Sequence, residues 1–171
     1  EQGDRFAQLI EDLLTISQIE SGKLRARPEP ADVAIVINQA LADTEARAQV
    51  ECSPGLTATI GVEHLRQILI NFIRNAQKYG SPPLRVRAYT LGDETNIEVA
   101  DEGAGVPAEF EAHLFERFSQ AHRGATGASR GVGLGLSIVQ ALAETYGGRA
   151  WYRPNEPHGA VFGVTLPTGP S

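Results

Sequence analysis

Two asparagines and a lysine recur at helical spacing in the stretch NFIRNAQKYG, residues 71–80. Asn71, Asn75 and Lys78 are four and three residues apart, so a helix would place all three along one side. The remaining residues read as the buried face of the same helix. This polar stripe predicts that something polar lies against the helix.

Two glycine-rich turns follow, DEGAG at residues 101–105 and GVGLG at residues 131–135. Alternate glycines let backbone amides approach an anion, and GVGLG leads directly into a helix, so the pair favours a phosphate site. Each motif alone has a structural explanation. DEGAG equally fits a tight strand exit, GVGLG a close helix contact, and each asparagine a cap or a satisfied core amide.

The elements that must position these groups are predicted from periodicity and turn residues. The N-terminal half predicts a helix over residues 4–21, a short edge strand over 23–30, a helix from Asp32 to about Ala48, strands near Val50 and 57–60, and a helix over 62–79. The C-terminal half predicts a hairpin from LRVRAYTL and TNIEVAD, a helix through Phe115 and Phe118, a loop over 119–130, a helix over 133–146, and strands in WYRP and GAVFGVTLP.

Composition bounds the class of protein. The chain has 171 residues, of which 42% are hydrophobic and 21% charged, as in a folded domain. Its net charge of −6 argues against a nucleic-acid surface, and no apolar run reaches membrane-spanning length. The single Cys52 cannot form an internal disulfide. Because methionine is absent, we expect a fragment of a longer protein.

The ordered set N-x-x-x-N-A-x-K-Y, D-x-G-x-G, F-x-x-F and G-x-G-L-G-L-S resembles the ATP-binding catalytic domain of sensor histidine kinases, within the superfamily of gyrase, Hsp90, histidine kinase and MutL ATPases. The resemblance implies an α/β, two-layer sandwich of a mixed, mainly antiparallel sheet and three helices (the Bergerat-type ATP-binding fold), preceded by one N-terminal helix. It implies the second helix of a dimerisation and phosphotransfer domain over residues 1–22, the ATP-binding domain over 23–168 and an ATP lid over 106–130.

The resemblance also implies roles for individual residues. Asn75 would bind the Mg²⁺ that bridges the ATP phosphates, with Asn71 near the same phosphates. Lys78 would lie over the phosphates, Tyr79 against the adenine, and Asp101 would accept a hydrogen bond from the adenine amino group. The other residues implied to bind the nucleotide are Gly103, Gly105, Phe115, Phe118, Gly131, Gly133, Leu134 and Gly135. Arg123 and Arg130 are the lid cations expected to meet the γ-phosphate.

Three departures from the family pattern bear on mechanism. Relatives commonly carry aspartate where this chain has Gly61, which predicts a small stability cost. The lid lacks one usual arginine, since Gly127 stands there. Hydrolytic relatives have a glutamate base at the position of Asn71. Because an amide cannot act as a base, we expect little hydrolysis of ATP.

The expected partners are ATP, the dimerisation and phosphotransfer domain of the same kinase, and a response regulator. We expect a cytoplasmic domain of a homodimeric parent, with any anchor in the bacterial inner membrane lying outside this sequence. Because the phosphoacceptor histidine is missing, the fragment should not phosphorylate itself. Two alternatives remain: an S-adenosylmethionine-dependent methyltransferase, suggested by VADEGAGVP, and a catalytically silent kinase-like interaction module.

Overall fold

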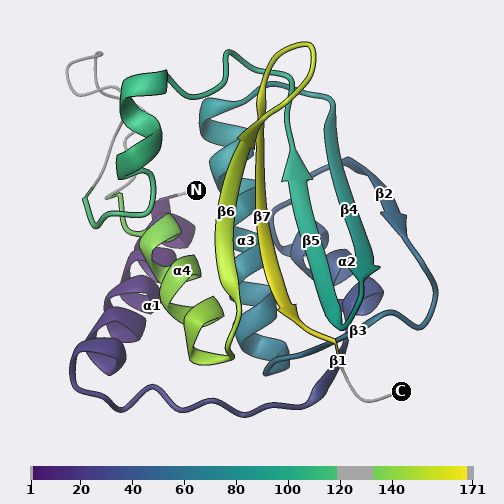
Figure 1. Ribbon diagram of the computed structural model, residues 1–171. Coiled ribbons are helices and arrows are strands. Elements are labelled where there is room, and N and C mark those ends of the chain that lie inside the picture. Colours follow the sequence, from purple (N-terminus) through teal and green to yellow (C-terminus); the bar gives the residue numbers. More distant parts are fainter. Residues whose placement is uncertain (1, 119–132, 169–171) are drawn as a thin grey trace.

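The protein, seen in a computed structural model that describes residues 2–118 and 133–168, is built in two layers (Figure 1). One layer is a sheet in the order β2 (Ala48–Cys52), β4 (Leu84–Leu91), β5 (Glu94–Ala100), β7 (Ala160–Pro167) and β6 (Arg149–Pro154). β2 runs parallel to β4, whereas the other neighbouring strands are antiparallel. A separate two-stranded ribbon joins β1 (Pro30–Asp32) to β3 (Thr57–Thr59).

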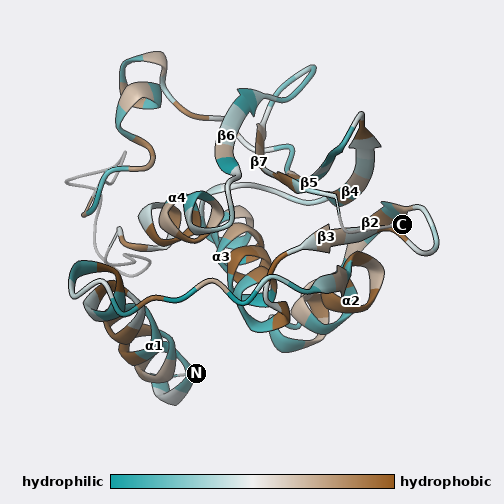
Figure 2. Ribbon diagram, turned by 60° about the horizontal axis from the view of Figure 1, so that its bottom comes forward, coloured by the Kyte–Doolittle hydropathy of each residue, from teal (hydrophilic) through white to brown (hydrophobic). Residues whose placement is uncertain are grey.

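The second layer consists of α2 (Val33–Asp43), α3 (Val62–Tyr79) and α4 (Gly135–Thr145), which cover one face of the sheet. β4 shows why this face is buried: Leu84, Val86 and Ala88 alternate with exposed arginines and point into the core. α3 packs its apolar residues against them, and the brown, apolar side of each helix turns toward the sheet in Figure 2. This arrangement confirms the predicted two-layer fold with its mixed, mainly antiparallel sheet.

Local chemistry explains most boundaries. The carboxylate of Asp32 accepts a hydrogen bond from the Ile35 N–H and caps α2. α2 ends at Asp43, not near Ala48 as predicted, because Glu45 adopts a positive φ of 52° and Thr44 hydrogen-bonds back to the last turn. The hairpin between β4 and β5 turns at Gly92, whose φ is 60°.

Two further sequence predictions are wrong. Residues 23–29 form no strand but an extended linker, and pairing begins only at Pro30. The helix predicted through Phe115 and Phe118 is instead a short 3₁₀ helix, η1 (Ala108–His113), followed by turns.

The start of α4 differs from the predicted boundary. α4 begins at Gly135 rather than at residue 133, because Gly133 has a positive φ of 76°.

The N-terminal helix α1 (Gln2–Glu20) lies alongside α4 (Figure 1). Its contacts with the domain are largely polar, joining Gln8 to Arg74, Thr15 to Gln67 and Glu20 to Arg117. An apolar stripe on α1 is exposed at Phe6, Ile10, Leu13 and Leu14, and α1 carries brown segments in Figure 2. None of the helices in the described ranges is long and apolar enough to cross a membrane.

The face of the sheet opposite the helices carries an ion-pair cluster around Glu98. This side chain on β5 is only 2% exposed, and its carboxylate lies 3.4 Å from Arg87 and 3.1 Å from Arg153. The hydroxyl of Tyr89 donates to the same carboxylate at 3.4 Å. A carboxylate buried this deeply needs these partners to offset the cost of its desolvation.

We expect Glu98→Ala to destabilise the fold by about 1 to 3 kcal/mol, below the range for fully buried pairs because both arginines reach solvent. Equilibrium urea unfolding measures the change. Glu51→Ala is the matched control, since Glu51 also pairs with Arg87 but is 47% exposed, and it should cost less than about 0.5 kcal/mol. Equal losses in the two variants would contradict the structural role of Glu98.

Candidate functional site

The C-terminal half of α3 carries the polar stripe predicted from the sequence. Asn71 is 8% exposed, Asn75 is half-buried and Lys78 is exposed, so the stripe passes from the interior to the surface along the helix. Among the described residues, Nδ2 of Asn71 is a buried side-chain atom without a hydrogen-bond partner. An unsatisfied buried amide is costly, which marks this point as one where a polar ligand would be stabilised.

The N-terminus of α4 lies directly against Asn71. A Cβ atom placed on Gly135 would lie 2.9 Å from the Asn71 Oδ1 atom, closer than real Cβ contacts. Gly135 therefore allows the first turn of α4 to approach the amide. The backbone N–H groups of a helix N-terminus favour anions, so this junction unites an amide donor with an anion-binding helix end.

Asp101 follows β5 at the opposite end of the polar stripe. Its carboxylate accepts a hydrogen bond from the Gly103 N–H at 2.8 Å and is 4% exposed. Gly80, the residue that ends α3, would place a Cβ only 2.3 Å from the Asp101 Cγ atom. A side chain at Gly80 is thus excluded, and the carboxylate is held between the end of α3 and the Gly103 turn.

Three positions that the sequence did not connect with the site, Asn155, Gly159 and Ala160, lie against the backbone of Asp101. The Asn155 side-chain amide donates to the Asp101 carbonyl at 2.8 Å, and the Asp101 N–H donates to the Ala160 carbonyl at 2.9 Å. Gly159, with φ of 113°, passes so close that a Cβ would lie 2.0 Å from the Asp101 carbonyl oxygen. The only sequence signal was the turn-forming stretch NEPHG, which does not reveal what it packs against.

Burial raises the pKa of Asp101 above its ordinary value of 3.8, while the backbone N–H of Gly103 opposes the shift. The ionised carboxylate therefore costs stability at neutral pH. Stability from this group is complete below its ordinary pKa and is lost as the pH rises through the raised one. A buried, charged acceptor kept at such a cost is typical of a binding site.

Lys78 and Tyr79 complete the exposed end of α3. The pKa of Lys78 is lowered, first by desolvation and then by the nearby cations Arg5 and Arg74, while Asp12 opposes the shift. Arg5 and Asp12 belong to α1, so this helix reaches the same end of α3. Tyr79 is 46% exposed and leaves its ring available to a flat ligand.

The two ends of the site are separated by the length of α3 between Asn71 and Gly80. Nine residues of helix span about 14 Å, with Asn75 midway between the ends. The anion-binding junction with α4 lies at one end and the buried Asp101 carboxylate at the other. An elongated ligand with an anionic tail and a hydrogen-bond donor at its head fits this arrangement.

The F-x-x-F pair lies within the expected lid, residues 106–130. Phe115 is half-buried against the core, whereas Phe118 is 56% exposed and has a positive φ of 59°. The Phe118 N–H donates to the Gly133 carbonyl at 2.8 Å, so the chain just before α4 lies against Phe118. Leu134 is buried and caps α4 without a side-chain bond. Arg123, Arg130 and Gly131 lie outside the described residues.

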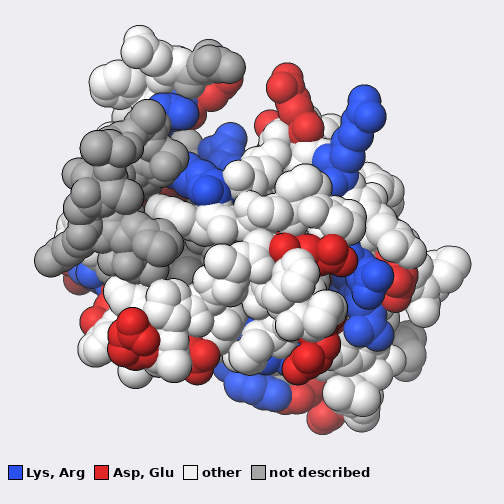
Figure 3. Space-filling model, turned by 90° about the horizontal axis from the view of Figure 1, so that it is seen from above, with Lys and Arg blue, Asp and Glu red and all other residues white. Residues whose placement is uncertain are grey.

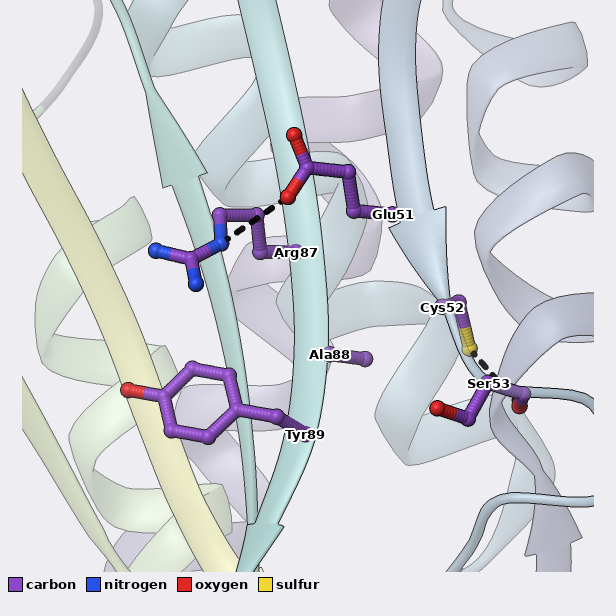
Figure 4. Close-up of a pocket in the computed structure, with 6 residues that line it drawn as sticks. All are labelled: Glu51, Cys52, Ser53, Arg87, Ala88 and Tyr89. Atoms are coloured by element: carbon purple, nitrogen blue, oxygen red, sulfur yellow. Dashed lines mark hydrogen bonds and ion pairs between the residues drawn. The ribbon is translucent and has the colours of Figure 1, made fainter.

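A separate hollow lies beside β2 and β4, lined by Glu51, Cys52, Ser53, Arg87, Ala88 and Tyr89 (Figure 4). It contains none of the predicted site residues, and the Glu51–Arg87 ion pair and the Cys52 thiol contact with the Ser53 carbonyl account for its polar groups. The hollow therefore does not compete with the α3 site.

Figure 3, which shows the molecule from above, has positive and negative side chains interspersed over that face, without a broad basic patch.

Comparison with known proteins assigns the family. The model of the histidine kinase-, DNA gyrase B- and HSP90-like ATPases matches residues 61–170, more than half of the chain. The chain belongs to this family of ATPases, and membership implies ATP binding. The match includes α3, Asp101 and the start of α4.

Similar curated proteins are histidine kinases. The circadian input-output histidine kinase CikA of Synechococcus elongatus is 31% identical over 98% of this chain and 24% of its own length. The signal transduction histidine-protein kinase AfsQ2 of Streptomyces coelicolor is 34% identical over 98% of this chain and 31% of its own. The chain therefore spans about a quarter to a third of these relatives.

Solved structures give the same result. Full-length ShkA, solved in complex with AMPPNP, aligns over 100% of this chain and 37% of its own with a TM-score of 0.79 and 28% identity. The mycobacterial sensor histidine kinase MprB aligns over 85% of this chain and 100% of its own with a TM-score of 0.70 and 26% identity.

We expect Asp101→Asn to weaken binding of an ATP analogue and of ADP alike, by about tenfold to a hundredfold. The asparagine amide would present a donor where the adenine amino group is expected to donate. The same substitution should raise stability at neutral pH, because it removes a buried charge, and the gain should shrink toward acidic pH. Calorimetric titration and urea unfolding measure the two effects. An unchanged affinity in the folded variant would exclude Asp101 from base recognition.

Proposed function

We propose that this chain is the ATP-binding catalytic domain of a two-component sensor histidine kinase, which binds Mg-ATP and donates the γ-phosphoryl group to a histidine. The observation that carries the proposal is the buried, unpartnered amide of Asn71 at the N-terminus of α4. Together with Asp101 at the other end of the polar stripe, it supports separate positions for the phosphates and for adenine. The similarity to histidine kinases over nearly the whole chain supports the same function.

Asn75 is the proposed Mg²⁺ ligand. Within residues 2–118 and 133–168, no group of three or more His, Cys, Asp or Glu side chains is arranged to hold a metal ion. A cation bound here would depend on oxygen atoms of the nucleotide phosphates and of water, with a single amide ligand from the protein. This donor set suits Mg²⁺, which keeps several waters and binds substrate phosphates. When bound, the ion would neutralise charge on the transferring group.

Phosphoryl transfer depends on position and charge compensation rather than on covalent chemistry by the protein. Asn71 and the α4 N-terminus would hold the phosphates, with Lys78, Arg123 and Arg130 as the cations that meet them. Gly103, Gly105 and Tyr79 would contact the base, and Phe115, Phe118, Gly131, Gly133, Leu134 and Gly135 would frame the lid. Because Asn71 is an amide and cannot remove a proton from water, transfer to the histidine is favoured over hydrolysis.

α1 supports a dimeric parent protein. Its exposed residues Phe6, Ile10, Leu13 and Leu14 form an apolar stripe that is expected to be covered by a helix of the dimerisation domain. The phosphoacceptor histidine would lie on that helix, and the phosphoryl group would then pass to a response regulator. Residues 1–22, 23–168 and 106–130 are the proposed helix of the dimerisation domain, catalytic domain and lid. We place the domain in the cytoplasm.

The two alternatives are less well supported. A methyltransferase reading requires a parallel, doubly wound sheet, and the observed sheet is mainly antiparallel with helices on one face, which excludes that reading. A silent interaction module is disfavoured because Asn75 and Asp101 are both present, and Asp101 is held in place at a cost in stability.

We expect Asn75→Ala to weaken ATP-analogue binding in Mg²⁺ by about tenfold or more and to have little effect in chelator. The reason is that Asn75 acts through the ion, whereas Asp101 acts through the base. Calorimetric titration of each variant, with and without Mg²⁺, separates the two roles. Gln77→Ala is a matched control on the exposed side of the same helix. An equal loss of affinity with and without Mg²⁺ would contradict the metal role.

A further inference from the structure

The linker between α1 and the catalytic domain meets the N-terminus of α3 at a cluster of four residues. Arg27 and Glu29 come from the linker, His64 from the first turn of α3, and Tyr146 from the end of α4. We refer to these four residues as the linker latch. None of them belongs to the nucleotide site, which lies at the other end of α3.

Tyr146 is the centre of the linker latch. Its side chain is 8% exposed, and its hydroxyl accepts a hydrogen bond from the Arg27 N–H at 3.0 Å. The same hydroxyl lies 2.6 Å from Nδ1 of His64. This short distance fits a hydroxyl that donates to Nδ1 of a neutral His64, whose own hydrogen is then on Nε2. The lowered pKa of His64 favours the same neutral form.

Glu29 attaches the linker to the same helix end in a second way. Its carboxylate accepts a hydrogen bond from the Val62 N–H at 3.1 Å, and its carbonyl accepts one from the Ile60 N–H, also at 3.1 Å. Gly61 makes no side-chain cap for α3, so the linker supplies the missing acceptor.

The glycine at position 61 is explained by the same cluster. A Cβ on Gly61 would lie 2.9 Å from the Tyr146 hydroxyl and 3.5 Å from the Arg27 carbonyl oxygen. The aspartate that relatives commonly carry here would therefore collide with the linker latch. The small stability cost expected from the sequence is offset by the cap that Glu29 provides.

We propose that Tyr146 and His64 are positioning residues that hold the linker against the start of α3 and so fix the direction in which α1 leaves the catalytic domain. The proposal rests on the proposed function in one respect, since α1 is the helix that would carry the domain to its histidine partner. Because the linker latch holds the linker on α3, the position of the histidine-bearing partner depends on the same helix that would contact the nucleotide.

The linker latch should open as the pH falls. The groups facing His64 are Arg27 from the linker, Glu63 from its own helix and Tyr146 from α4. Desolvation, and then the charge of Arg27, lower the pKa of His64 below its ordinary 6.5, while Glu63 opposes them. The stabilisation is therefore complete above pH 6.5 and is lost as the pH falls through the lowered pKa. Protonation puts a hydrogen on Nδ1 and removes the acceptor for the Tyr146 hydroxyl.

Hydrogen–deuterium exchange of the 171-residue chain tests the proposal at the Arg27 amide, corrected for the intrinsic exchange rate at each pH. In the unaltered chain, protection of this amide should fall between about pH 7.5 and about pH 5.5. Tyr146→Phe keeps the ring but removes the hydroxyl, and it should lower protection at the higher pH by about fivefold. In Tyr146→Phe, protection of the Arg27 amide should be nearly independent of pH.

His64→Asn is the matched variant, because the asparagine Oδ1 atom can accept from Tyr146 in place of Nδ1 but does not titrate. It should retain protection at the higher pH and lose the pH dependence, a result that a purely structural role for His64 would not give. ATP-analogue affinity, measured separately, should be unchanged in both variants and reports on the proposed function alone. The proposal is overturned if Tyr146→Phe leaves the Arg27 amide as protected as before, or if pH dependence survives in His64→Asn.

Discussion

Ile68, Phe72 and Ala76 bury one side of α3 against the sheet, and this contact sets the depth of every polar group on the same helix. The Phe72 ring lies 6.2 Å from that of Phe162 on β7, so the helix is fixed to the middle of the sheet. Because 3.6 residues complete a turn, the side that carries Asn71, Asn75 and Lys78 lies next to this packed side and passes from the interior at Asn71 to the surface at Lys78. The site is a consequence of this one packing arrangement.

Each end of the polar stripe on α3 contacts a different element, and in both cases a glycine allows the close contact. Gly135 brings the N-terminus of α4 onto Asn71, whereas Gly80 leaves room for the Asp101 carboxylate. The two ends differ in electrostatics: backbone N–H groups attract an anion at the first, and a buried carboxylate accepts a hydrogen bond at the second. The linker from α1 also contacts the N-terminus of α3. In the proposed function, a single helix would contact the phosphates and the base, and it also contacts the linker from α1.

Much of the fold and of the candidate site could be predicted from the sequence. The stripe of Asn71, Asn75 and Lys78 was visible because helical periodicity alone places such residues together. The segment through Phe115 and Phe118 was wrongly predicted to be helical, because two aromatics at helical spacing carry no information about the positive φ of Phe118 or its hydrogen bond to Gly133. The support of Asp101 by Asn155 and Gly159, and the capping of α3 by Glu29, could not be predicted, since these contacts join segments distant in the chain.

The central claim is that α3 holds a nucleotide lengthwise, with the base near Asp101 and the phosphates at the α4 N-terminus. Nuclear magnetic resonance of the isotopically labelled chain, titrated separately with adenosine and with an ATP analogue in Mg²⁺, tests it directly. Adenosine should shift the amide signals of Gly80 and Gly103 and leave those of Gly135 and Ser137 unchanged, whereas the ATP analogue should shift both sets. If adenosine shifts the α4 signals, or if the ATP analogue leaves them unchanged, the proposed orientation of the ligand is wrong.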